Sequence, residues 1–372
     1  MSTRIFKNAT IFEGENLEER KGYLKIQNGE IKEIEDGKPP KEGTDLRNSF
    51  VLPPLINAHT HLGDSIAKSI YSEKNQKDVV GKHGEKFSAL KNSSDYEKIE
   101  SMKKEIEKMK RAGILTHIDF RENGLEGVKL LEKAKDKSVN SIILGRPKIK
   151  EDYTTLIERT DGIGIPSLNS YSEERIAKIS KIVNEKRKLL SFHVSETEKA
   201  REKSLKKYGK SEIEKSLEYN PSFLVHGTHA SKEDLDLLAE RKEPLVMCPR
   251  ANCLLNDGMP PIKKALDSGV KLFLGTDNVS INPPNLFREL SFTWSILRER
   301  SSRVGSKEAK ELLKSVTTNP IKTINSPFEP IKEGNKASFI ILSRNNNLKK
   351  IRDPYVGIVN RATEENVTGM VL

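Results

Sequence analysis

The chain has 372 residues, 35% of them hydrophobic, and its 65 Lys and Arg against 54 Asp and Glu give a formal net charge of +11. No apolar run approaches the roughly 18 residues that cross a membrane, and the first residues lack the apolar stretch of a secretory signal. Acidic and basic residues alternate along most of the chain, which is typical of solvated helix faces and not of a nucleic-acid-binding surface. The two cysteines, Cys248 and Cys253, fit no disulfide pattern. We therefore expect a cytoplasmic protein with neither a nucleic acid nor a membrane as its partner.

Both ends of the chain have the pattern of short β-strands. Near the start, Asn28-Gly29 separates two alternating runs, which is a strong signal for a hairpin. Near the end, Ala337–Leu342 has the composition of a strand. Two β-rich ends around a long middle predict one small β-sandwich domain built from residues 1–49 and 327–372.

Between these ends, segments with strand and helix patterns alternate. Eight apolar runs of strand length, most of them followed by a segment with helical charge periodicity, predict an α/β fold, a (β/α)8 barrel of the TIM type over residues 50–326. The connection at 66–96 is longer than usual, and such connections are functional lids or disordered segments. The candidate strands are Phe50–Ala58, Ile114–Phe120, Asn140–Gly145, Gly162–Leu168, Leu189–Val194, Ser222–His226, Pro244–Cys248 and Lys271–Thr276.

Histidines gather at the ends of the predicted strands. His59 and His61 end the first strand, and because side chains in a strand alternate, residues two apart point the same way. His193 and His226 end the fifth and sixth strands, and Asp277 ends the eighth. The carboxyl ends of barrel strands meet at one face. Three imidazoles and one carboxylate from strands one, five and eight therefore predict a site for one divalent metal ion, Zn²⁺ or Fe²⁺.

Several motifs carry a resemblance to a known family. They are Pro-x-(Leu/Ile)-x-Asn-Ala-His-x-His at 53–61, His-x-x-Glu at 193–196, Val-His-Gly at 225–227, Cys-Pro-Arg-Ala-Asn at 248–252 and Gly-Thr-Asp at 275–277. Together they resemble the metal-dependent amidohydrolase superfamily, near its cytosine deaminase and chlorohydrolase-like branch, over about 45–370. The chain departs from the family pattern at Pro54, where Gly is usual, and at Ala337-Ser338, where Ala-Asp is usual. Both departures lie outside the chemistry.

The resemblance implies a role for each residue of these motifs. His59, His61, His193 and Asp277 would bind one metal ion, with Zn²⁺ preferred over Fe²⁺. Asp277 would also accept a proton from the bound water, and Glu196 would protonate a ring nitrogen and then the departing group. His226 would orient the water or polarise the developing oxyanion. No lysine ends the fourth predicted strand, which favours one metal ion over a lysine-bridged pair.

These roles predict a hydrolase that deaminates an amino-substituted nitrogen heterocycle, such as a nucleobase, nucleoside or pterin, through a metal-bound hydroxide. The partner would be this small-molecule substrate, and the resemblance adds the expectation of a homo-oligomer. Hydrolysis of a cyclic amide or removal of chloride at the same site is an alternative. A catalytically silent binding protein is another.

For some residues, the sequence leaves a structural role open. Glu196 fits the first turn of a helix, where carboxylates favour the helix dipole, and His226 fits a packed strand. Arg121 and Glu122 fit substrate contacts and solvated loop charges equally well. The remaining histidines fit structural or surface positions better than metal ligation: His83 in the long connection, His117 in the second strand and His229 after the sixth.

Overall fold

The structure is a computed structural model that describes residues 3–37, 39–74, 76–80, 84–148 and 152–372. The chain divides into two compact units. The terminal unit comprises residues 1–56, 110–115 and 286–372, and the barrel unit comprises 57–109 and 116–285. The domain boundaries expected after residues 49 and 326 stay a prediction.

The terminal unit contains one six-stranded sheet with strands from both chain ends. The turn between the second and third strands is Asn28-Gly29, and both residues have a positive φ, as a tight hairpin turn requires. The rings of Phe6 and Phe339 meet edge to face at 5.4 Å in its core, one from each chain end. The prediction of a small β-rich domain built from both chain ends is confirmed; its strands form one six-stranded sheet, whereas the sequence predicts a β-sandwich. In sheet order the strands are β15 (Val367–Val371), β14 (Phe339–Leu342), β4 (Thr44–Leu52), β1 (Thr3–Glu13), β2 (Glu18–Gln27) and β3 (Glu30–Asp36).

Helices complete the terminal unit. One of them begins at Pro354, and the carboxylate of Asp353 before it accepts a hydrogen bond from the Val356 N–H, which satisfies a free donor of the first turn. The helices of this unit are α12 (Leu286–Arg300), α13 (Ser306–Ser315), α14 (Thr318–Ile321) and α15 (Pro354–Arg361), with 3₁₀ turns at Asn346–Leu348 and Glu364–Asn366.

A curled sheet of nine parallel strands organises the barrel unit. Its strands follow one another in sheet order almost as they do in the chain, as the (β/α)8 prediction requires, and that prediction is confirmed. In sheet order they are β12 (Leu272–Leu274), β11 (Leu245–Met247), β10 (Phe223–His226), β9 (Leu189–Val194), β8 (Gly162–Ile165), β7 (Asn140–Gly145), β6 (Ile114–Arg121), β5 (Leu55–His61) and β13 (Asp277–Asn278).

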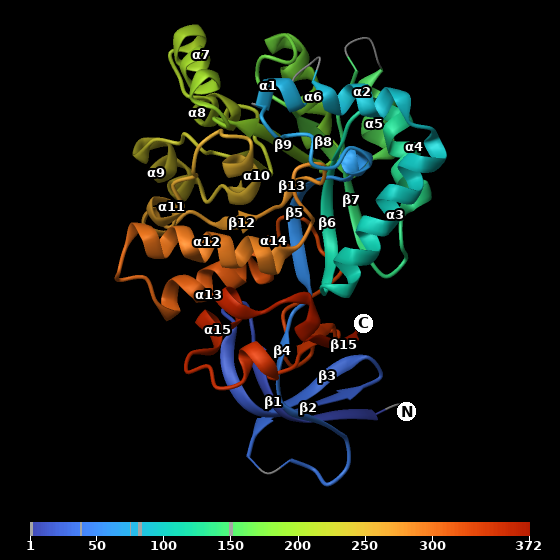
Figure 1. Ribbon diagram of the computed structural model, residues 1–372, viewed down its shortest axis with the longest axis vertical. Helices are drawn as coiled ribbons and strands as arrows, with labels where there is room; N and C mark the ends of the chain where they lie inside the picture. Colours follow the sequence, from blue (N-terminus) through green and yellow to red (C-terminus); the bar gives the residue numbers. More distant parts are fainter. Residues whose placement is uncertain (1–2, 38, 75, 81–83, 149–151) are drawn as a thin grey trace. The chain divides into compact units, whose positions relative to one another are not determined.

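Helices follow these strands and lie outside the curled sheet, while α1 and α2 lie near the carboxyl ends of the strands (Figure 1). Several begin at a Ser, Thr or Asp whose side chain accepts an N–H of the first turn, such as Ser172 and Ser231. They are α1 (Gln76–Val80), α2 (Glu85–Asn92), α3 (Asp95–Arg111), α4 (Gly124–Ala134), α5 (Tyr153–Arg159), α6 (Glu173–Glu185), α7 (Glu198–Tyr208), α8 (Glu212–Leu217), α9 (Lys232–Arg241), α10 (Pro249–Leu254) and α11 (Ile262–Ser268), with a 3₁₀ turn at Leu62–Ile66.

The first predicted strand, Phe50–Ala58, is wrong in its bounds. Residues 50–52 end β4 of the six-stranded sheet, and β5 begins only at Leu55. Pro53-Pro54 separates the two strands because proline has no N–H for a sheet ladder. At its other end, β5 continues through His61, so both histidines lie within the strand.

The eighth predicted strand, Lys271–Thr276, is also divided. After β12, the Gly275 N–H donates to the Met247 carbonyl on one side (3.0 Å), and the Thr276 N–H donates to the His59 carbonyl on the other (3.1 Å). The next two residues form β13 and pair with β5. A Cβ on Gly275 would lie 2.6 Å from the Cβ of His59, so this close approach needs glycine.

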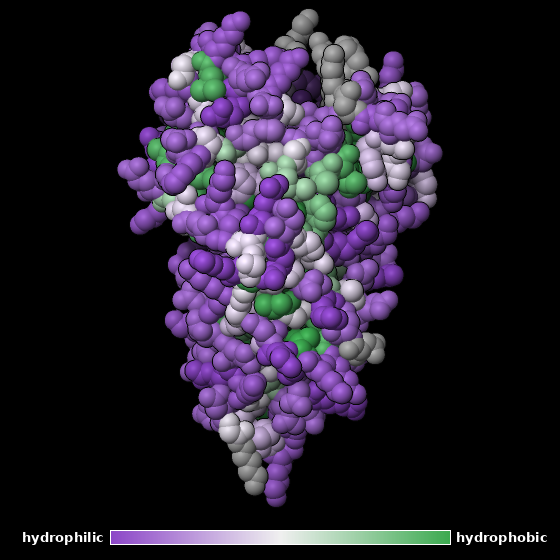
Figure 2. All heavy atoms as spheres, turned by 60° about the vertical axis from the view of Figure 1, so that its left-hand side comes forward, coloured by the Kyte–Doolittle hydropathy of each residue, from purple (hydrophilic) through white to green (hydrophobic). Residues whose placement is uncertain are grey.

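Within the described residues, no helix has both the length and the apolar character needed to cross a membrane. The face drawn in Figure 2 is mainly hydrophilic, and its hydrophobic residues form small separate groups among the coloured atoms. This agrees with the charged residues that make up 32% of the chain.

Replacing Gly275 by Ala tests the closure of the barrel. Overpacking against His59 is expected to lower the free energy of unfolding by about 1–3 kcal/mol, measured by denaturant titration. Gly305→Ala is the control, because a Cβ there meets nothing within 4 Å and the backbone φ is negative. Equal stability of the two variants would contradict the steric requirement at Gly275.

Candidate active site

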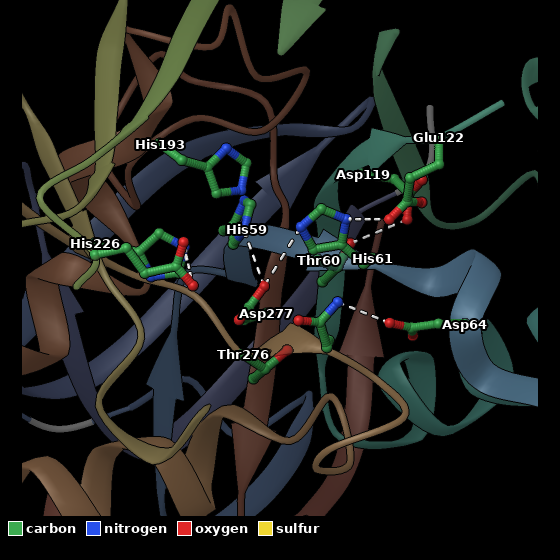
Figure 3. Close-up of polar contacts among 12 residues, drawn as sticks. His59, Thr60, His61, Asp64, Asp119, Glu122, His193, His226, Thr276 and Asp277 are labelled. Atoms are coloured by element: carbon green, nitrogen blue, oxygen red, sulfur yellow. Dashed lines mark hydrogen bonds and ion pairs between the residues drawn. The ribbon is translucent and has the colours of Figure 1, made fainter. Parts of the chain in front are cut away.

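The polar residues at the strand ends converge in the barrel unit. Figure 3 shows the rings of His59, His61, His193 and His226 around the carboxylate of Asp277. Two overlapping groups have ligand atoms that all lie within 4.8 Å of one another: His59, His193 and His226, and His59, His61 and Asp277. The structure thus brings together every residue that the sequence predicts as a ligand.

Barrel closure places Asp277 against the histidines of β5. Its Oδ1 lies 3.1 Å from the Nε2 of His59 and 3.4 Å from the Nε2 of His61. The side chain of Asn57 bonds Thr276 twice, accepting its N–H at 3.0 Å and donating to its Oγ1 at 2.7 Å. The Asn-Ala-His and Gly-Thr-Asp motifs therefore hold each other in register.

Two of the converging residues have an unusual backbone. Asp277 has φ +59° and His226 has φ +75°, and both lie in the left-handed region that non-glycine residues seldom adopt. Such a conformation costs on the order of 1–3 kcal/mol and persists only where the surrounding structure imposes it. Here it turns both side chains toward the same point at the end of the sheet.

Burial and mutual contact set the charge states of the site. Burial lowers the pKa of His59 to about 3 and holds the pKa of His193 well below its usual range. Burial alone would raise the pKa of the Asp277 carboxyl. The hydrogen bond to His59 and the neighbouring imidazoles outweigh burial and hold this pKa far below its usual range. Neutral imidazoles around an ionised carboxylate present lone pairs, as a divalent cation requires.

His61 differs from its neighbours. Burial lowers the pKa of its imidazole, but the Glu122 carboxylate outweighs burial and raises that pKa. The surroundings of His61 therefore attract positive charge, which either a proton or a metal ion can supply.

Hydrogen-bond partners distinguish His193 from His226. The Nδ1 of His193 lies 3.2 Å from the Ile165 carbonyl, which can only accept, so Nδ1 carries the proton and Nε2 has a free lone pair. The Nδ1 of His226 lies 3.3 Å from the Nδ2 of Asn252, which can only donate, so neutral His226 has its proton on Nε2. His193 is suited to bind a cation, and His226 is suited to donate a hydrogen bond.

Glu196 lies next to His226 at the end of β9. Its Oε1 is 3.8 Å from the Nε2 of His226, and the amide of Gln76 on α1 donates to it at 2.5 Å. Helix α7 begins only at Glu198, so Glu196 precedes the helix. Ser195, with φ +45°, turns the chain here, and its N–H donates to Glu212 at 2.7 Å.

A cavity of about 740 Å³ opens over these groups. His61, His193, His226 and Asp277 line it together with Glu196. Its volume lies in the range of roughly 300–1,000 Å³ that is typical of small-molecule sites. Aromatic side chains contribute apolar surface to the wall: Phe87, Phe120 and Tyr171.

Two of the other histidines, His117 and His229, have structural positions. His117 is buried in β6 between Ser141, whose Oγ is 2.7 Å from its Nε2, and Thr60, whose Oγ1 is 3.4 Å from its Nδ1. The Nε2 of His229 is 2.6 Å from the Asp257 carbonyl. His83 lies outside the described residues.

The sequence does not reveal the charged residues buried beside His61. Arg121 and Glu122 are only 3% and 2% exposed, so they are not solvated loop charges. They contact each other, Glu122 also contacts Lys86, and Arg121 also contacts Asp119. Lys86 in turn contacts a further buried carboxylate, Asp64. The one available signal is Asp-Phe-Arg-Glu at the end of an otherwise apolar strand, because charges at such a place are seldom accidental.

Comparison with known proteins gives matches over most of the chain. The model of the amidohydrolase family matches residues 50–369. A Methanothermobacter thermautotrophicus protein with the provisional name of aminohydrolase is 32% identical, and the alignment covers 100% of this chain and 98% of the relative. The 5-methylthioadenosine/S-adenosylhomocysteine deaminase of Pyrococcus furiosus is 26% identical, over 91% of this chain and 86% of its own.

The fold also matches solved structures. One is a mutant of the atrazine chlorohydrolase of Arthrobacter aurescens, complexed with zinc and atraton. The match has a TM-score of 0.81 at 16% sequence identity and covers 99% of this chain and 93% of that one. At this identity the likeness concerns the fold.

Addition of a divalent metal ion is expected to stabilise the protein. At a free ion concentration 1,000 times the Kd, binding adds about 4 kcal/mol to the free energy of unfolding. His193→Ala should abolish most of this gain, whereas His229→Ala should keep it. Thermal unfolding of the apo-protein with and without zinc measures the difference, and an equal gain in both variants would contradict the site.

The pH dependence of stability is expected to reveal Glu212. Burial raises the pKa of this carboxyl from 4.5 to about 7. The folded state therefore holds this proton more tightly than the unfolded state does, and the resulting stability is present below pH 4.5 and lost as the pH rises to about 7. Relative to Glu212→Gln, the wild type should lose up to about 1.4 kcal/mol per pH unit in this window. Urea unfolding at several pH values tests this, with Glu198→Gln as an exposed control. A constant difference between wild type and Glu212→Gln would contradict the shift.

Proposed function

Because the chain belongs to the amidohydrolase family, we propose that it is a zinc-dependent hydrolase that deaminates an amino-substituted nitrogen heterocycle, such as a nucleobase, nucleoside or pterin. One observation carries this proposal. The potential ligand atoms of His59, His61, His193 and Asp277 converge, and the last three of these residues line one cavity together with Glu196. The similarity to an adenosine-derivative deaminase supports a heterocyclic amine as the substrate.

The proposed ligands are His59, His61, His193 and Asp277, with one ion per chain. Strand β8 ends at Ile165 and offers no lysine to bridge a second ion. Imidazole and carboxylate suit both zinc and iron, and the zinc complex of a protein with the same fold supports zinc. When bound, the ion would lower the pKa of a coordinated water toward neutrality and so supply the nucleophile.

Asp277 and Glu196 would move the protons of the reaction. Asp277 is ionised at neutral pH because its pKa is held low, so its carboxylate can accept a proton from the attacking water. Glu196 lies in the cavity wall and would give its own proton to a ring nitrogen, then take up the proton that Asp277 accepted and pass it to the amine. The second proton of the water would return to Glu196 as the carbonyl forms. The C–N bond would then break with release of ammonia, while the water oxygen stays on the ring.

His226 would stabilise charge on the oxygen. Asn252 donates to its Nδ1, which leaves the Nε2–H available on the side of Glu196. A donor fixed in this way needs no reorganisation when negative charge develops, and such donors contribute strongly to catalysis. The same proton removes the lone pair that His226 would need as a fifth ligand.

Cyclic amide hydrolysis and dechlorination are the competing reactions, and the fold shared with a chlorohydrolase makes dechlorination a specific alternative. The presence of Glu196 favours deamination. Ammonia leaves only when its nitrogen is protonated, whereas chloride leaves as the anion and needs no acid.

A substrate panel tests the proposal directly. The zinc-loaded protein is expected to release ammonia from at least one member of a panel of aminopurines, aminopyrimidines, aminotriazines and pterins. Glu196→Gln should lower kcat/KM by about 10²–10⁴-fold without changing the zinc content, and Glu198→Gln should have little effect. Release of chloride from chlorotriazines with no ammonia from any amine would contradict deamination.

A further inference from the structure

Five buried charged side chains form a cluster beside His61, on the side of its Nδ1. None is more than 3% exposed. Two are cations and three are carboxylates, and we call this set the charge cluster: Asp64, Lys86, Asp119, Arg121 and Glu122. None of these residues has a part in the deamination steps above, although isolated buried charges are costly and need a compensating partner.

Glu122 is the centre of the charge cluster. Its Oε1 lies 3.0 Å from the Nδ1 of His61 and also contacts the ammonium of Lys86. Its other oxygen, Oε2, accepts from the Arg121 guanidinium at 2.7 Å. The carboxylate therefore faces the imidazole of His61 (Figure 3) and also contacts two cations, Lys86 and Arg121.

Two other members attach the charge cluster to the chain beside two of the three ligand-bearing strands, β5 and β13. Asp119 accepts the N–H of Leu62, which directly follows His61, at 2.6 Å. Asp64 accepts from the amide of Asn278, which directly follows Asp277, at 2.7 Å, and lies 3.3 Å from the Lys86 ammonium. The cluster thus spans the chain segments on either side of the His61–Asp277 contact.

The formal charges of the cluster do not cancel. Three carboxylates against two cations leave one formal negative charge on the cluster as a whole, and Glu122 is the carboxylate that lies at the Nδ1 of His61. A carboxylate at this nitrogen orients the ring, holds a proton on Nδ1 and makes Nε2 a stronger electron donor. The Nε2 faces Asp277 at 3.4 Å, which is where the proposed function places the metal ion.

We propose that Glu122 is a positioning residue for His61, that it strengthens metal binding through the Nε2 of this imidazole, and that Lys86 holds helix α2 against the same carboxylate. The inference rests on the proposed function only in taking His61 as a metal ligand. Lys86 belongs to α2, and it lines the cavity with its neighbour Phe87. One carboxylate therefore joins a metal ligand to the segment that forms part of the cavity wall.

Zinc affinity separates this role from a purely structural one. The full-length chain is freed of metal, and its Kd for zinc is measured by competition with a chromogenic chelator. Glu122→Gln is expected to raise the Kd by about 10–100-fold. Lys86→Met should leave it within about threefold of the wild type or lower it, because the carboxylate remains and loses a competing cation.

Two further variants complete the experiment. The double variant Glu122→Gln/Lys86→Met removes both members of the closest ion pair, so no isolated ammonium remains. It can be used to measure the zinc affinity if the single Glu122 variant folds poorly. It should bind zinc as weakly as Glu122→Gln. Glu126→Gln is the matched control, because this carboxylate on α4 is 78% exposed and its ion pair is with Lys148. Its Kd should equal that of the wild type.

The spectrum of the cobalt-substituted protein gives a second measurement that a general loss of stability would not reproduce. Its ligand-field bands should shift in the Glu122 variants and stay unchanged in Glu126→Gln. Unchanged zinc affinity in the Glu122 variants, or an equal loss in Lys86→Met, would overturn the proposal. A wild-type chain that binds no divalent ion would instead overturn the metal site itself.

Discussion

The closure of the barrel between β5 and β13 is the constraint on which the site depends. Gly275 lies so close to His59 that no side chain fits there, and the next residue donates its N–H to the His59 carbonyl. This contact brings Asp277, which lies 218 positions from His59 in the chain, within 3.1 Å of it. The proposed ligands His59 and Asp277 are therefore part of the closure of the barrel, so a change that weakens this closure also alters the geometry of the site.

Burial acts in two ways at this end of the barrel. It makes His59 and His193 neutral, which suits them to bind a cation. It also demands that every charge near them be compensated. The formal charge of Asp277 and the net formal charge of the charge cluster add up to two negative charges near His61, which balances the charge of one divalent ion. The low dielectric surroundings make this match count for far more than it would in water.

The sequence predicts the barrel and the converging ligands because both follow from local patterns. A strand places His59 and His61 on one side, and the barrel brings strand ends together. The break at Pro53-Pro54 was also readable, since proline interrupts a ladder. The charge cluster could not be predicted from the sequence. Lys86 comes from a helix within a long connection, and no spacing rule relates it to Glu122. Only the folded chain shows which buried charges face one another.

The different roles of His193 and His226 also depend on contacts that only the folded chain shows. Both end neighbouring parallel strands, and both lie close enough to His59 to share a cation. Their distances alone do not separate a ligand from a hydrogen-bond donor. The atom that faces each Nδ1 separates the two roles. At His193 a carbonyl faces Nδ1, so Nε2 keeps a lone pair; at His226 the amide of Asn252 faces Nδ1, so Nε2 carries the proton. The hydrogen-bond partner at Nδ1 thus determines which role each histidine can take. This partner belongs to a different element in each case, so the sequence motif around the histidine does not contain it.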